Sequence, residues 1–378
     1  MSEFISPREL VPSLRRVVVK IGTSVLAGEG KAVVSRHAVE SVAAEAAALR
    51  RAGIEVILVT SGAIGAGMGV LGFKSRPRRD LAKLQAAAAA GQGRLMQWYS
   101  GALEREGYHA AQLLLTREDL EDPRRYRNVK ATLTTLLKAK AIPIINENDT
   151  VSTEEIRYGD NDLLSAHVAL LTRADLLAIL SDVDRFRGPD GPQTLVTRIT
   201  PEMERAAGGA GRVVSSGGMR TKLEAARLVM AGGIPMVFMN GRRPGSLAGT
   251  ILKKELRGTW FVPRKGVRIK GGQGWAVTGK PKGTIFVDAG AREALTRQGR
   301  SLLASGVRAV EGDFRRGDVV AIADAAKSKE FARGIVRYSR TELEKIKGLR
   351  SEAAGQALGR KPDEVAHRDS MVILRRDG

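Results

Sequence analysis

Apolar runs that end in glycine turns alternate with longer segments of helical pattern over the first two thirds of the chain. Residues 16–21 (RVVVKI) are β-branched and lead into the turn 22–24 (GTS), and residues 55–60 (EVILVT) lead into 61–63 (SGA). Between them, residues 35–53 place apolar side chains every three or four positions, which predicts a helix. A strand, a helix and a second strand with glycine turns indicate a parallel sheet.

This alternation continues to about residue 259. We expect helices at 81–106 (interrupted by Gly91-Gln92-Gly93), 124–140, 163–171 and 223–231, and strands at 110–115, 141–145, 176–180 and 234–239. The chain then changes to short β-rich runs about a dozen residues apart, which are typical of a small barrel, at 283–287, 307–311, 319–322 and 331–336. We therefore predict an α/β catalytic domain over residues 1–270, a small β-barrel-like domain over 281–359, and a tail, 360–378, that packs on the second domain.

The composition narrows the chemistry. The 378 residues include no cysteine, which excludes disulfides, zinc-thiolate sites, iron-sulfur clusters and cysteine nucleophiles. No apolar run approaches the roughly 18 residues of a membrane-spanning helix. The first 16 residues hold acidic side chains and two prolines instead of a signal-peptide core. We expect a cytoplasmic protein without a membrane partner, and oxygen ligands favour Mg²⁺ over zinc.

The net charge of +21 raises the possibility of a nucleic-acid partner. Residues 271–378 hold 21 Lys and Arg against 14 Asp and Glu, so the positive excess is spread in proportion to length. A dispersed excess fits a basic proteome or a phosphate-rich substrate as well as it fits RNA.

Polar side chains gather at the ends of two predicted strands and before the helix between them. The strand at 141–145 stops at residues 146–149 (NEND), a second polar group follows at 159–162 (GDND), and the strand at 176–180 leads into 181–184 (SDVD). The carboxyl ends of strands form the edge at which open α/β sheets bind ligands. Each carboxylate alone is more often a cap, but as a set they can hold magnesium or a substrate ammonium group: Asp149, Asp160, Asn161, Asp162, Asp182 and Asp184.

Two lysines accompany glycine turns. Lys20 precedes the turn at Gly22, and Lys222 ends the sequence 217–222 (GGMRTK) at the start of a predicted helix. A lysine in the first turn opposes the helix dipole, so an anion is expected nearby. Glycine lets the backbone approach a ligand closely, and N–H groups at helix starts bind anionic oxygens. Ordinary βα turns remain the alternative, and the combination favours a phosphate cradle outside the Walker class.

Several other motifs are rejected. Gly67, Gly69 and Gly72 fit G-x-G-x-x-G, but they begin several residues after the strand, and no acidic strand end follows at the required distance. Residues 274–280 begin a Walker A pattern, yet Pro281 stands where Ser or Thr would bind magnesium. The four histidines share no ligand spacing or triad pattern, and we interpret them as structural.

Six segments of the first domain, in order, resemble the glutamate 5-kinase family: 17–24 (VVVKIGTS), 59–67 (VTSGAIGAG), 143–149 (PIINEND), 159–165 (GDNDLLS), 181–184 (SDVD) and 217–222 (GGMRTK). Later segments resemble a PUA module: 285–290 (IFVDAG), 310–317 (VEGDFRRG) and 366–369 (AHRD). The resemblance implies an amino-acid-kinase-like three-layer α/β/α sandwich with a mainly parallel sheet, followed by a PUA domain.

The resemblance also implies a reaction. The family transfers the ATP γ-phosphoryl group to the side-chain carboxylate of L-glutamate, giving L-glutamyl 5-phosphate in the first step of proline biosynthesis, with Mg²⁺ as cofactor. Catalytic roles then fall to Lys20, Lys222 and Asp182, and ATP binding to Lys20, Ser181, Asp182, Ser216, Gly217, Gly218, Met219, Arg220, Thr221 and Lys222. Glutamate is expected at Ser61, Asp149 and Asn161, and the phosphate-cradling backbone at Gly22, Thr23 and Gly62. No protein ligand for the metal is assigned.

Two departures and one alternative stay open. Arg185-Phe186-Arg187 replaces the turn usual after the SDVD strand, which leaves the adenine contacts undefined, and Ser215-Ser216 replaces a Gly-Thr pair. The expected partners are ATP, L-glutamate, further copies of the chain and a glutamyl-phosphate reductase. Another carboxylate kinase is a rival within the fold, and an RNA-binding or RNA-modification accessory role through the PUA domain is the alternative from a different class.

Overall fold

The computed structural model describes residues 3–27, 33–77, 80–151, 161–207, 218–265, 279–326 and 328–374. The chain divides into two compact units, residues 1–119 with 128–266 and residues 120–127 with 267–378. The predicted boundary at residue 270 lies within residues 266–278, which are outside the described residues. The predicted boundary at residue 281 lies shortly after that range.

The first unit is built on an eight-stranded sheet in the order β3-β4-β2-β1-β5-β9-β10-β8. Its strands are β1 (Arg16–Ile21), β2 (Glu55–Val59), β3 (Ala110–Leu115), β4 (Ile142–Glu147), β5 (Leu176–Ser181), β8 (Leu195–Val196), β9 (Met236–Asn240) and β10 (Thr259–Phe261). Every pairing is parallel except β9 with β10. The predicted mainly parallel sheet is confirmed.

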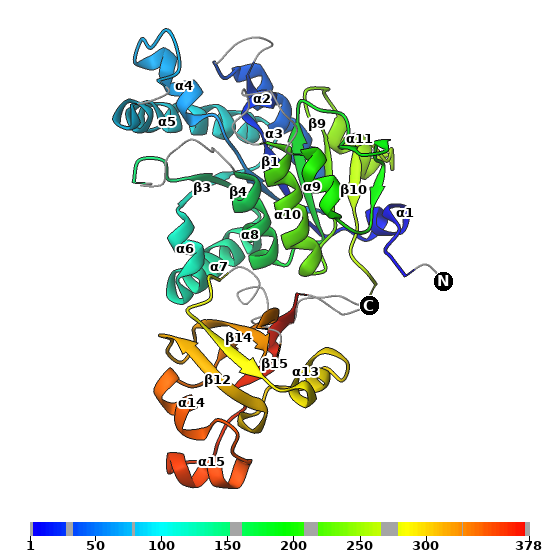
Figure 1. Ribbon diagram of the computed structural model, residues 1–378. Helices are drawn as coiled ribbons and strands as arrows, with labels where there is room; N and C mark the ends of the chain where they lie inside the picture. Colours follow the sequence, from blue (N-terminus) through cyan, green and yellow to red (C-terminus); the bar gives the residue numbers. More distant parts are fainter. Residues whose placement is uncertain are drawn as a thin grey trace. The chain divides into compact units, whose positions relative to one another are not determined.

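Helices cover both faces of this sheet, which gives the predicted three layers (Figure 1). The helices α3, α4, α5 and α11 lie on one face, and α8 and α10 lie on the other. The helices of the described chain up to residue 265 are α1 (Pro7–Leu10), α2 (Thr23–Leu26), α3 (Arg36–Arg51), α4 (Ala63–Val70), α5 (Leu81–Arg105), α6 (Arg117–Glu121), α7 (Pro123–Lys138), α8 (Asn161–Thr172), α9 (Pro201–Ala207), α10 (Met219–Ala231) and α11 (Ser246–Leu252). None of the helices within the described ranges has the length and apolar character of a membrane span.

Strand β1 lies at the centre of the sheet, and its apolar side chains explain why. Val17, Val18 and Val19 are fully buried, as suits a strand covered by helices on both faces. The chain pairs β1 first with β2 and later, on the other side, with β5. Connections on the two sides use opposite faces, α3 on one and α8 on the other (Figure 1). This is a topological switch point, where the carboxyl ends of neighbouring strands form a crevice for ligands.

Helices α4 and α5 cross at two glycines. A Cβ atom at Gly67 would lie 1.8 Å from the carbonyl oxygen of Ala87, and one at Gly91 would lie 1.9 Å from that of Ala63. The helix predicted over residues 81–106 was expected to be interrupted at Gly91. That prediction is wrong, because α5 runs unbroken from Leu81 to Arg105. Gly67 and Gly91 serve backbone-to-backbone packing, so the first glycine of the G-x-G-x-x-G pattern has a structural role at this crossing.

The second unit contains a five-stranded sheet in the order β12-β11-β13-β14-β15. Its elements are β11 (Gly283–Val287), α13 (Ala289–Thr296), β12 (Val307–Gly312), β13 (Val319–Asp324), β14 (Lys329–Val336), α14 (Arg340–Ile346), α15 (Ser351–Leu358) and β15 (Ala366–Ile373). The four predicted β-rich runs are strands β11 to β14. The segment that was assigned to the tail contributes β15, which pairs antiparallel with β14.

Gly67→Ala should destabilise the protein, because the added methyl group meets the backbone of α5, which cannot move like a side chain. Overpacking costs about 1–3 kcal/mol. Gly69→Ala on the same helix is the matched control, since a Cβ there has no neighbour within 4 Å. Alanine should stabilise that position by up to about 1 kcal/mol. Urea denaturation measures both, and equal stability of the two variants would contradict the crossing.

Candidate active site

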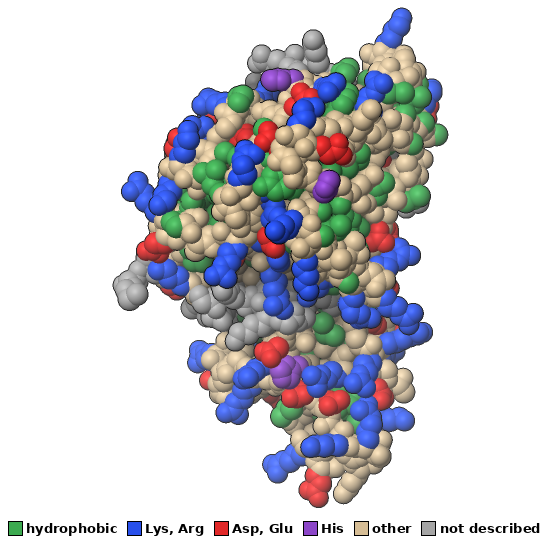
Figure 2. All heavy atoms as spheres, turned by 180° about the vertical axis from the view of Figure 1, so that it is seen from behind, with side chains coloured by type: hydrophobic (Ala, Val, Ile, Leu, Met, Phe, Trp, Pro, Cys, Tyr) green, Lys and Arg blue, Asp and Glu red, His purple; other side chains and the backbone are tan. Residues whose placement is uncertain are grey.

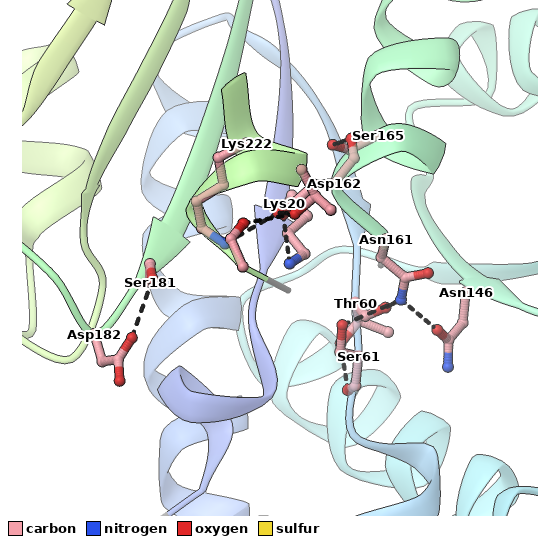
Figure 3. A network of polar contacts seen from close by, with 12 residues as sticks. Lys20, Thr60, Ser61, Asn146, Asn161, Asp162, Ser165, Ser181, Asp182 and Lys222 are labelled. Carbon is pink, nitrogen blue, oxygen red and sulfur yellow. Dashed lines mark hydrogen bonds and ion pairs between the residues drawn. The ribbon is translucent and has the colours of Figure 1, made fainter. Parts of the chain in front are cut away.

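Three buried charged side chains converge beside the ends of the central strands (Figure 3). The Asp162 carboxylate, at the start of α8, binds two ammonium groups: Lys20 Nζ lies 2.6 Å from its Oδ1 and Lys222 Nζ 3.0 Å from its Oδ2. Asp162 is 0% exposed, Lys20 3% and Lys222 6%. The structure thus brings the two predicted lysines, 202 positions apart in sequence, to one carboxylate.

The charges of this cluster do not cancel. Burial alone would raise the pKa of Asp162, but the ammonium groups of Lys20 and Lys222 hold that pKa well below the usual range of a carboxyl group. The carboxylate is therefore ionised at neutral pH, and the three groups together carry one formal positive charge. Two ammonium groups beside one carboxylate are suited to an anion.

The position of Lys222 follows from the start of α10. Gly218 caps the helix with extended backbone, and the Thr221 hydroxyl lies 2.7 Å from the carbonyl oxygen of Gly218 and 3.1 Å from Asp162 Oδ2. Lys222 is in the first turn, where its charge opposes the helix dipole. The anion that this placement predicts is Asp162.

A chain of amides links α8 to the ends of β2 and β4. The Asn161 side-chain NH₂ faces three acceptors, namely the Thr60 carbonyl oxygen, Ser61 Oγ at 3.1 Å and Asn146 Oδ1 at 2.9 Å. Asn146 in turn donates to Gln92 Oε1 at 2.8 Å. The other Asn161 atom, Oδ1, is buried and has no hydrogen-bond partner among the described residues. An unsatisfied buried acceptor costs stability unless a ligand supplies a donor.

A cleft adjoins these amides. The residues that line it are Thr23, Ser61, Gly62, Ala63, Ile64, Gly65, Arg76, Asn146, Glu147, Asp149 and Asn161. It therefore contains all three predicted glutamate-binding residues. The sequence pattern identifies Asn146 and Glu147 only as neighbours of Asp149. It does not identify Arg76, which lies in a loop with no motif.

Asp149 titrates unusually in this cleft. Burial and the repulsion of Glu147 raise its pKa to about 7, although the positive charge of Arg76 acts in the opposite direction. A cationic ligand beside Asp149 would stabilise the ionised form. The carboxyl group is thus suited to bind an ammonium group above neutral pH.

Two of the glycine turns have defined local roles. Gly62 has φ +99°, a conformation that favours glycine, and it begins α4 at the cleft. The Gly22 N–H donates to the Leu180 carbonyl oxygen at 3.1 Å, so in this structure it takes part in the sheet instead of facing the cleft. Thr23, at the start of α2, lines the cleft.

The remaining predicted residues lie at the end of β5, at the start of α10 beside Lys222, or outside the described chain. Ser181 ends β5 and lies 3.1 Å from Asp182, which is exposed and separate from the Lys20–Asp162–Lys222 group (Figure 3). Gly218, Met219, Arg220 and Thr221 begin α10, whereas Asp160, Ser215, Ser216 and Gly217 lie outside the described residues. Phe186 is buried against Phe261, so its ring belongs to the core.

The described residues contain no group of three or more His, Asp or Glu side chains arranged to hold a metal ion. Both carboxylate oxygens of Asp162 face lysines. Its donor atoms therefore do not form a metal site.

Comparisons with known proteins identify the two domains of the chain. The model of the amino acid kinase family matches residues 15–240, and that of the PUA domain matches residues 283–355. A carbamate kinase from Giardia lamblia bound to AMP-PNP has a TM-score of 0.46 and 18% identity, covering 66% of this chain and 99% of that chain. That likeness is too weak to support any inference about the site.

The curated relatives are much more similar. Glutamate 5-kinase of Citrifermentans bemidjiense is 46% identical over 377 residues, covering 97% of this chain and 100% of the relative. Glutamate 5-kinase of Geobacter sulfurreducens is 47% identical over 373 residues, covering 97% and 99%. The resemblance seen in the sequence is confirmed: the chain belongs to the amino acid kinase family and, within it, to the glutamate 5-kinase family, with a PUA domain after the kinase domain.

Proposed function

We propose that this protein is an ATP-dependent kinase that phosphorylates the side-chain carboxylate of L-glutamate, giving L-glutamyl 5-phosphate and ADP in the first step of proline biosynthesis. The observation that carries the proposal is the position of the Lys20–Asp162–Lys222 cluster. Asp162, which binds the two ammonium groups, follows directly after Asn161, a residue that lines the cleft, so the start of α8 joins the lysine cluster to the cleft. The similarity to glutamate 5-kinases over 97% of the chain supports the same function.

The proposed chemistry needs no general base. A glutamate carboxylate is ionised at pH 7, and one of its oxygens attacks the γ-phosphorus while the bond from that phosphorus to the β,γ-bridging oxygen breaks. The electron pair of that bond leaves with ADP. The protein has to align the reactants and stabilise charge on the transferred group. Lys20 and Lys222 provide that charge, and Asp162 holds their ammonium groups 2.6 and 3.0 Å from its two oxygens.

The cleft is suited to the acceptor. We assign Asp149 to the α-ammonium group of glutamate and the unsatisfied Oδ1 of Asn161 to a second ammonium hydrogen. Ser61, whose hydroxyl lies 3.1 Å from Asn161 Nδ2, completes the glutamate contacts. We assign the N–H groups at the start of α4, after Gly62, to anionic oxygens of the reacting groups.

For the nucleotide we propose Ser181, Asp182 and the stretch from residue 216 to Lys222. Gly218 to Lys222 form the start of α10 and carry the charge and N–H groups that suit phosphates. Mg²⁺ is the proposed cofactor and supplies charge neutralisation on the β- and γ-phosphate oxygens when bound.

The product is an acyl phosphate, which reacts readily with water and amines. We therefore propose a glutamyl-phosphate reductase as the pathway partner. We also propose a cytoplasmic location and a homo-oligomeric state.

The charge distribution does not favour the RNA-binding alternative. Lys and Arg side chains are spread over the face in Figure 2, with Asp and Glu among them. In the second unit several arginines face a carboxylate within 3.0 Å: Arg292 with Asp324, Arg308 with Asp288, Arg333 with Glu330, Arg337 with Glu364 and Arg360 with Glu342. These pairings reduce the positive charge available to a phosphate backbone.

Lys222→Ala should abolish most of the activity while the fold is retained. The loss of one charge aimed at the transferred group should lower kcat by roughly 100- to 1,000-fold. The acyl phosphate is trapped with hydroxylamine and measured as the hydroxamate. Arg227→Ala is the control, because Arg227 is an exposed cation on the same helix, α10. A fully active Lys222→Ala variant would rule out the proposed role.

Asp162→Asn should lower stability, because it removes the anion between two buried ammonium groups. Breaking a buried ion pair from one side costs about 3–5 kcal/mol. The pKa of Asp162 is lowered on folding, so its stabilisation is complete above the carboxyl range and declines below about pH 4. The difference in the free energy of unfolding between wild type and Asp162→Asn, measured by urea denaturation, should be smaller at pH 3 than at pH 7. As a control, Asp182→Asn, at an exposed position, should change the stability little. A difference that grows in acid would refute the assignment.

The specificity for glutamate should depend on pH through Asp149. With its pKa at about 7, kcat/KM for glutamate should fall about tenfold per pH unit well below pH 7 and level off above it. N-acetylglutamate has no ammonium group, so its use should be weak and should lack this dependence, and Asp149→Asn should give a flat, low profile with glutamate. Profiles from pH 5.5 to 8.5 test this, and a flat wild-type profile would contradict it.

A further inference from the structure

The charged side chains of the cleft are suited to a carboxylate group of an amino acid as well as to its ammonium group. Among the described residues that line the cleft, Arg76 is the one cation, and it shares the cleft with two acidic residues, Glu147 and Asp149. Arg76 comes from the loop between α4 and α5 and is half-buried. Its positive charge lowers the pKa of Asp149 against the effects of burial and Glu147. A cation and a carboxylate therefore line the same cleft.

The acceptor brings three charged groups, and only two have been given partners. One carboxylate meets the phosphoryl group near Lys20 and Lys222, and the ammonium group meets Asp149. The second carboxylate is bonded to the same carbon atom as the ammonium group, so its partner must lie beside Asp149. Placing a carboxylate in a partly buried cleft without a cationic or N–H partner is costly.

We propose that Arg76 binds the α-carboxylate of the acceptor and thereby selects α-amino acids over otherwise similar ω-amino acids. The assignment rests on the proposed glutamate kinase function. A guanidinium has five N–H donors in a planar fork, so it can bind a carboxylate through two hydrogen bonds and still face Glu147 or Asp149. The pair Arg76 and Asp149 then recognises the zwitterionic end of the substrate.

Two other arrangements make different predictions. The backbone N–H groups of Ala63, Ile64 and Gly65 also line the cleft and could hold the α-carboxylate instead. Arg76 could also act only through Asp149, by keeping that carboxyl group ionised. The first arrangement makes Arg76 dispensable, and the second confines its effect to pH values near and below 7.

The experiment compares L-glutamate with 4-aminobutyrate, which has the same ammonium group and reacting carboxylate but lacks the α-carboxylate. ADP formation is measured at pH 7 and at pH 8.5, where Asp149 is ionised in every variant that retains it. Arg76→Ala should raise KM for glutamate roughly 10- to 100-fold at both pH values, since a charge-assisted hydrogen bond is lost. The value of kcat at saturating glutamate should change by less than about threefold. For 4-aminobutyrate, kcat/KM, or the inhibition constant if turnover is too slow, should stay within about twofold.

Two further variants keep the result interpretable. Arg76→Lys retains the charge without the fork and should lie between wild type and Arg76→Ala in KM. Lys74→Ala removes an exposed cation from the same loop and should leave KM unchanged. Thermal unfolding of each variant checks the fold, and if Arg76→Ala does not fold, the comparison rests on Arg76→Lys.

The proposal is overturned if the glutamate KM of Arg76→Ala is unchanged, if its increase disappears at pH 8.5, or if 4-aminobutyrate loses as much as glutamate. These results require an active wild-type enzyme. A wild type that forms no acyl phosphate from glutamate would instead refute the proposed function itself, so the two failures are distinguishable.

Discussion

One buried carboxylate holds the candidate active site together. Asp162 binds Lys20 and Lys222, which come from the first strand and from a helix 202 positions later in the chain. Two buried ammonium groups repel each other, and a single carboxylate brings them together while leaving one formal positive charge. That remaining charge suits an incoming phosphoryl group. The same residue thus stabilises the fold and prepares the site for an anion.

The sheet places these groups at one edge. β1 is central and carries Lys20 directly before its last residue, Ile21, while its neighbours β2 and β5 end at Val59 and Ser181 on the same edge. The glycines hold the covering helices close: Gly62 allows the turn into α4, and Gly67 and Gly91 let α4 and α5 touch through their backbones. The cleft residues at the start of α4 therefore depend on a helix crossing that leaves no room for a side chain at Gly67 or Gly91.

Much of this arrangement could be predicted from sequence because it is local. β-branched runs predicted the strands, and the glycine turns drew attention to Lys20 and Lys222, which the structure brings to one carboxylate. Tertiary contacts were less accessible: Gly91 suggested a helix break, yet α5 continues because α4 packs there. Asp162 was recognised as a carboxylate but not as the partner of two lysines, since its contacts span the chain. Arg76 belongs to no motif, so only the cleft revealed it.

The central claim is that Asp162 makes two lysines act on one phosphoryl group. The most direct measurement is calorimetric binding of ADP with aluminium fluoride and glutamate, a mimic of the phosphoryl group in transit, to wild type and Asp162→Asn. Wild type should bind the mimic at least about 100-fold more tightly than it binds ATP and glutamate. Asp162→Asn, if folded, should bind glutamate within a few-fold of wild type and lose the extra affinity. Equally tight binding of the mimic by both proteins would contradict the account.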